Sequence, residues 1–126
     1  MKNIFLLSLI IFISSCSFTN ISFWDDNQAY RSVDINVGAN KLNCNVIQDL
    51  SFHVASLEYN VFWLEQYSIN KKTKDIIEMI KPIKETLNDF RKRIDSKELS
   101  VGYCRLKQKI LIEQTNELSR AIMVRY

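Results

Sequence analysis

Apolar residues recur at helical spacing through most of the chain, in steps that alternate between three and four residues until the phase of the pattern shifts at Leu111. The first stripe predicts a helix over about residues 45–67, the second a helix over 73–94 and the third a helix over 98–124. The stripes comprise Ile47, Leu50, Val54, Leu57, Val61 and Leu64, then Ile76, Ile80, Ile83, Leu87, Phe90 and Ile94, then Leu99, Tyr103, Leu106, Ile110, Leu111, Leu118 and Ile122. This pattern predicts an all-α protein, a three-helix up-down bundle with a single core.

Pro82 lies within the second predicted helix and leaves a second arrangement open. Proline removes a backbone donor and clashes with the preceding turn, yet the stripe keeps its phase across it. We therefore expect one kinked helix; a split between residues 81 and 82 would instead give a four-helix bundle. The chain has only two glycines and one proline, and this scarcity of turn-forming residues favours long helices over a β architecture.

The first fifteen residues have the pattern of an export signal. Lys2 precedes an apolar run over residues 4–13 that only Ser8 interrupts, and two serines follow the run. A positive residue, an apolar core and small residues, in this order, are typical of a secretory signal peptide. The run is too short for a membrane-spanning helix, which needs about 20 apolar residues.

The tetrapeptide Ile13-Ser14-Ser15-Cys16 resembles the lipobox of bacterial lipoproteins, in which an aliphatic residue and two small residues precede a cysteine. The resemblance implies that Cys16 is diacylated on sulfur, becomes the mature N-terminus and is then acylated on nitrogen. Ser17 stands where an aspartate would resemble an inner-membrane retention signal, so we expect the outer membrane, on its periplasmic side. An ordinary signal peptide with an incidental cysteine is the alternative.

Two cysteines remain for the folded domain, Cys44 and Cys104. An exported chain enters an oxidising compartment, which predicts a disulfide between them, although two buried free thiols remain an alternative. The first and third helices of an up-down-up bundle run parallel, so their N-terminal ends lie together. Cys44 precedes the first helix and Cys104 lies in the first turns of the third, so the pairing and the topology agree.

Three segments follow from these patterns: a signal peptide over residues 1–15, a lipidated N-terminus with a tether over 16–43, and a helical domain over 44–126. Residues 17–43 show no helical period, and we interpret them as a tether between lipid and domain. Alternating Val33, Ile35 and Val37 also permit a short strand or an extended segment lying on the domain.

The sequence offers little for catalysis or metal binding. His53 is the single histidine, the two glycines are isolated, and no second histidine or closely spaced cysteine pair is present. We expect no enzymatic activity, no metal and no cofactor apart from the covalent lipid. The net charge of +3 is too small to indicate a nucleic-acid partner. The second helix is rich in lysine and arginine, which predicts a solvated face or contact with acidic lipids or an acidic client.

A second apolar row widens the face of the first predicted helix and provides the candidate binding surface. We expect Tyr59, Phe62, Trp63 and Tyr67 to contact a partner helix in an apolar groove. The alternative is that the third helix and the tether cover this row, in which case it belongs to the core.

The expected function is that of a non-catalytic adaptor held at the outer membrane by its lipid. The size, the lipid anchor and the helical composition are similar to those of helical pilotins of type II secretion, which carry a secretin segment to the outer membrane. The resemblance implies a helical segment of an envelope component as the partner. An exclusion or immunity lipoprotein of a plasmid or phage, and a structural envelope lipoprotein, remain open as alternatives.

Overall fold

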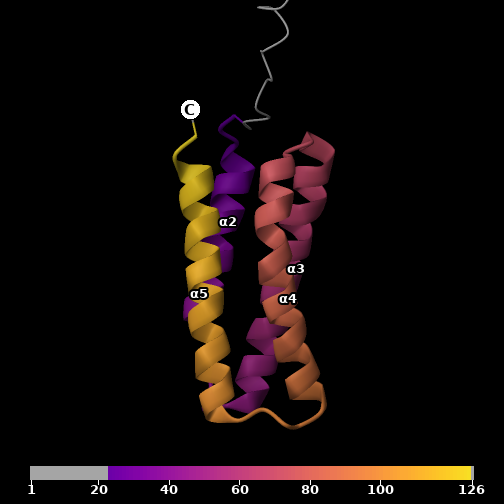
Figure 1. Cartoon of the computed structure of the whole chain (residues 1–126), viewed down its shortest axis with the longest axis vertical. Coiled ribbons are helices and arrows are strands. Elements are labelled where there is room, and N and C mark those ends of the chain that lie inside the picture. Colours follow the sequence, from indigo (N-terminus) through magenta and orange to yellow (C-terminus); the bar gives the residue numbers. More distant parts are fainter. Residues whose placement is uncertain (1–22, 126) are drawn as a thin grey trace, which may run out of the picture.

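Residues 23–125 are described by the computed structural model, and within this range the chain forms four α-helices and no strand. The helices are α2 (Asp26–Asn40), α3 (Ile47–Lys71), α4 (Lys74–Asp95) and α5 (Val101–Met123). They lie side by side along the long axis of the molecule, with the connections at its two ends (Figure 1). Because α2 and α4 each contact both α3 and α5, the domain is an up-down four-helix bundle.

The helix α2 corrects two predictions about the N-terminal half. Residues 26–40 are helical, so the three-helix bundle was wrong, and so was a tether or strand at these positions. The helix α4 runs without interruption through Pro82. The fourth helix therefore does not arise from a split after Lys81, which was the other arrangement that the sequence left open.

The helix α2 lacks a clear apolar stripe because small and polar side chains make up most of its core face. Of its larger apolar residues, Ile35 is buried, whereas Tyr30, Val33 and Val37 are exposed. A small core face lets α2 approach α3 closely: a Cβ atom added to Gly38 would lie 2.7 Å from the Leu57 side chain. The buried residues of α2 are Gln28, Ala29, Ser32, Ile35 and Ala39.

Polar side chains cap the N-termini of α2 and α5. Asp25 caps α2, since its carboxylate accepts hydrogen bonds from two backbone N–H groups of the first turn at 3.0 and 3.1 Å. Ser100 caps α5 by accepting from the Tyr103 N–H at 3.1 Å. The C-cap of α3 is Lys72, whose φ of 59° is left-handed.

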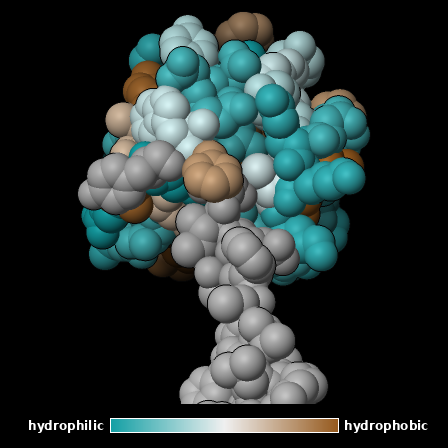
Figure 2. Space-filling model, turned by 90° about the horizontal axis from the view of Figure 1, so that it is seen from above, coloured by the Kyte–Doolittle hydropathy of each residue, from teal (hydrophilic) through white to brown (hydrophobic). Residues whose placement is uncertain are grey.

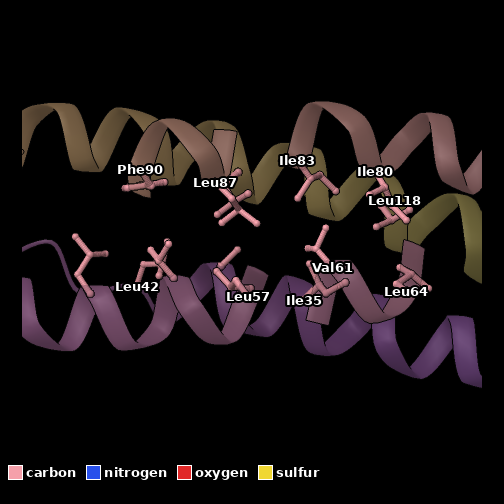
Figure 3. Packing of buried hydrophobic residues seen from close by; sticks show 14 of the residues in the cluster. Ile35, Leu42, Leu57, Val61, Leu64, Ile80, Ile83, Leu87, Phe90 and Leu118 are labelled. Atoms are coloured by element: carbon pink, nitrogen blue, oxygen red, sulfur yellow. The ribbon is translucent and has the colours of Figure 1, made fainter. Parts of the chain in front are cut away.

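The core confirms the first two apolar stripes. Side chains of α3 such as Leu57 and Val61 point toward those of α4 such as Ile83 and Leu87 (Figure 3). Every other stripe residue of these two helices is also buried, except Ile47, which is exposed, and Ile94, which is partly buried. The two helices therefore supply most of the large aliphatic side chains of the core.

The third stripe was wrong at Leu106, in its N-terminal half. Leu106 is 57% exposed, while Cys104 is fully buried and takes the core position in this part of α5. From Leu111 onward the prediction holds, because Leu118 and Ile122 are also fully buried. The phase shift seen in the sequence marks the residue at which the core face of α5 begins to carry large aliphatic side chains.

A disulfide joins Cys44 to Cys104 and confirms the predicted pairing. It links the α2–α3 loop to the first turn of α5, with the two Cα atoms 5.7 Å apart. Both residues are buried. The bridge therefore closes the end of the bundle at which α3 and α5 begin.

Candidate partner-binding surface

The structure divides the four aromatic residues predicted to bind a partner into two pairs. Tyr59 and Phe62 lie on the outer face of α3, with 64% and 58% of their surface exposed. Trp63 and Tyr67 are only partly exposed and contact residues of α2 or its cap. Of the four, the first pair offers the larger free aromatic surface.

Trp63 and Tyr67 belong to the interface between α2 and α3. Their rings are stacked, with centroids 4.9 Å apart and planes 10° from parallel. The guanidinium of Arg31 lies over the Trp63 indole, 4.6 Å from the ring centroid. The Tyr67 hydroxyl donates to Asp25 Oδ2 and accepts from Asn27 Nδ2, both at 3.1 Å. These contacts show that α2 covers part of the second apolar row.

Phe52 extends the exposed pair along α3. It is 70% exposed and lies seven residues before Tyr59, which places both rings on one face two turns apart. We call Phe52, Tyr59 and Phe62 the aromatic row. Phe52 was not among the predicted contact residues. Its seven-residue spacing from Tyr59 is the feature of the sequence from which it could have been predicted.

A pocket of about 200 Å³ opens beside Phe62, between α3 and α4. Val61 and Leu87, both buried, supply its apolar floor. Pockets that hold small-molecule ligands usually have volumes of about 300–1,000 Å³, so this one suits a single aliphatic side chain of a docked segment. The lining residues are Glu58, Val61, Phe62, Lys84, Leu87 and Asn88.

The cations of α4 near this pocket are paired with carboxylates of α3. Lys84 Nζ lies 2.7 Å from Glu65 Oε1, and Arg91 Nη2 lies 2.8 Å from Glu58 Oε2. The hydrogen bond with Glu58 is the main cause that raises the pKa of Arg91, so this guanidinium stays charged. Because the pairs cancel charge, α4 attracts an acidic client less than its composition alone indicated.

The predicted lipidation site, Cys16, and the predicted signal peptide lie outside the described residues. Between residues 23 and 125, no helix is both long and apolar enough to cross a bilayer. The same part of the chain holds no group of three histidine, cysteine or acidic residues arranged to bind a metal ion. His53 is partly exposed, and its Nε2 lies 3.9 Å from Asp49 Oδ1.

Trp63→Ala should lower the free energy of unfolding by about 3 kcal/mol, the lower end of the range for a buried aromatic side chain. The change removes the stack with Tyr67, the contact with Arg31 and packing against the core. Tyr59→Ala should change the same quantity by less than about 0.5 kcal/mol, because Tyr59 is largely exposed. Urea unfolding of both variants measures the difference, and equal losses would contradict the division into two pairs.

The aromatic row and the pocket beside Phe62 form one surface on α3 and α4, which we call the aromatic surface. It exposes aromatic rings and an aliphatic floor beside paired charges. The chain matches no protein-family model, and comparison with curated proteins and with solved structures gave no match either.

Proposed function

We propose that this protein is a lipid-anchored, non-catalytic adaptor of the bacterial outer membrane that binds a helical segment of an envelope protein. The anchor rests on the signal-peptide pattern and on the lipobox resemblance that ends at Cys16. The binding role rests on the aromatic surface. A pilotin-like accessory of a secretion system combines these two features, because it holds a client segment at the membrane through its own lipid.

The aromatic row is the observation that carries the proposal. Its three rings are each more than half exposed and lie on one helix. Burying an aromatic side chain fully is worth about 1.5–3 kcal/mol relative to leaving it in water, and this gain is largely unused in the isolated domain. Aromatic residues are enriched at protein interfaces for this reason. A partner that covers the row would recover the gain.

The pocket beside Phe62 defines the kind of segment that fits. An amphipathic helix lying along α3 would place one aliphatic side chain over Leu87 and further apolar side chains against Tyr59 and Phe52. The rim residues Glu58 and Lys84 already have charged partners. We therefore expect the segment to carry aliphatic anchors with neutral polar flanks, rather than a run of acidic residues.

Site-specific photocrosslinking in the native envelope tests this function. A benzophenone side chain at position 59 should crosslink one envelope protein, and Phe62→Ala should weaken the binding about ten-fold or more because it removes an interface anchor. Position 30 is the matched control, since Tyr30 is 69% exposed but lies on α2. If position 59 gives no more product than position 30, the aromatic surface does not bind a partner.

A further inference from the structure

The end of the bundle at which α2 begins exposes apolar residues close to the predicted anchor. The start of α2, the α3–α4 turn and the end of α5 lie together at this end (Figure 1). Phe23 is 84% exposed and Trp24 is 41% exposed. Figure 2 looks onto this end and shows hydrophobic side chains spaced among hydrophilic ones. The other large apolar residues exposed here are Ile69, Met123 and Val124.

Lysines of the α3–α4 turn accompany these apolar residues. Lys71, Lys72 and Lys74 are all exposed. Lys71 Nζ lies 3.7 Å from Asp25 Oδ2, so its charge is partly balanced, whereas no salt bridge within residues 23–125 balances the other two. Asp26 adds one exposed carboxylate at this end, whose Oδ1 accepts the Trp24 indole N–H at 2.6 Å. The turn therefore presents two cations from a short stretch of chain.

The length of chain outside the structure limits how far this end can be from a membrane. Cys16 precedes Phe23 by seven residues, which span at most about 25 Å when fully extended. The helix α5 has 23 residues and is therefore about 35 Å long. In an upright bundle the disulfide-linked end is about 35 Å farther from the anchor than the end that carries Phe23. The end that carries Phe23 is therefore the one held at the membrane surface.

We propose that this end of the bundle docks on the anionic surface of the leaflet that holds the acyl chains of Cys16. The proposal rests on the proposed lipid anchor. Phe23 and Trp24 lie at the interface, where aromatic rings are favoured, and the apolar stems of Lys72 and Lys74 carry their ammonium groups to the headgroups. The bundle then stands upright, and the aromatic surface on its side remains open to a client.

Tryptophan fluorescence of the lipidated protein in vesicles tests the docking. The sequence has two tryptophans, so Trp63→Phe leaves Trp24 as the reporter at the docked end. Trp24→Phe is the matched control, because it leaves Trp63, which lies about 12 Å back from the end of α3. In vesicles of phosphatidylethanolamine and phosphatidylglycerol with brominated acyl chains, we expect Trp24 to lose most of its emission and Trp63 to keep it.

A charge variant tests the contribution of the lysines. Lys72→Gln with Lys74→Gln should shift the docking equilibrium about thirty-fold toward the undocked state, since each lysine near an anionic surface contributes about five-fold. Lys92→Gln with Lys97→Gln, at the opposite end, should leave the Trp24 signal unchanged. The two pairs are matched because Lys72 and Lys97 both have a left-handed backbone, with φ of 59° and 57°.

The outcomes separate the docking from the anchor. If the protein floats with the vesicles and Trp24 keeps its emission, the anchor stands and the docking is overturned. Equal quenching of Trp24 and Trp63 would overturn the upright orientation, and an unchanged signal in the Lys72 and Lys74 variant would overturn the role of charge. An N-terminal peptide whose mass shows no acyl chain would instead overturn the anchor, and the docking with it.

Discussion

Replacing both Cys44 and Cys104 by serine should lower the free energy of unfolding by about 4 kcal/mol. The bridge spans a sequence separation of 60 residues, and a cross-link across a loop of this length restricts the unfolded chain by about this amount. Domains of this size have a total stability of about 5–15 kcal/mol. The variant should therefore unfold at a much lower urea concentration, which circular dichroism measures directly.

The position of the bridge also predicts which part of the domain loses stability first when the bridge is removed. The α2–α3 loop and the first turn of α5 meet through the disulfide, so hydrogen exchange should rise there before it rises in the middle of α3 and α4. Wild-type protein treated with a reductant is the control, and it should unfold like the double variant. A loss of stability below about 1 kcal/mol in both samples would contradict a stabilising bridge.

Cys16→Ser should abolish lipid attachment and release the protein from the membrane fraction. The cysteine sulfur is the acyl acceptor in the proposed processing, and a serine hydroxyl is a much poorer nucleophile than a thiolate. Several acyl chains hold a protein at a bilayer durably, at about 0.8 kcal/mol per buried methylene. Metabolic labelling with a palmitate analogue, followed by fractionation, measures both effects.

Ser17→Ala is the matched control for this substitution. It alters the neighbouring residue and leaves the cysteine in place, so the label and the membrane association should remain. Equal labelling of the wild type and the Cys16→Ser variant would end the lipoprotein interpretation. In that case the aromatic surface would still stand as a binding surface, because its residues lie in the helical domain.

The helices α3 and α4 were predictable because their stripes consist of large aliphatic residues. Burying a residue such as Leu57 or Ile80 contributes about 1.5–3 kcal/mol, and five buried positions on one face of each helix leave little freedom in how the helix is oriented. The first half of α5 was not predictable in this way. There the disulfide places Cys104 in the core, so Leu106 of the expected stripe faces solvent.

The candidate site was only partly predictable for a related reason. The sequence shows an excess of aromatic residues on α3, but it does not show which of them a neighbouring helix covers. Cover of this row by residues 17–43 was one of the alternatives, but without α2 the sequence could not show that the cover falls on Trp63 and Tyr67. The structure leaves Tyr59 and Phe62 more than half exposed, whereas Arg31 of α2 covers the Trp63 indole.

The sequence by itself determined the all-helical class and the helices α3 and α4, because long aliphatic stripes admit few arrangements, and it indicated the pairing of Cys44 with Cys104. Only the tertiary structure decided that residues 26–40 form a helix. The core face of this helix is small and polar, so it shows no apolar stripe in the sequence. The helix is stabilised by packing against its neighbours. Gln28 donates to Ser68 Oγ at 3.3 Å and to Thr73 Oγ1 at 2.9 Å, two partners that folding alone brings to it.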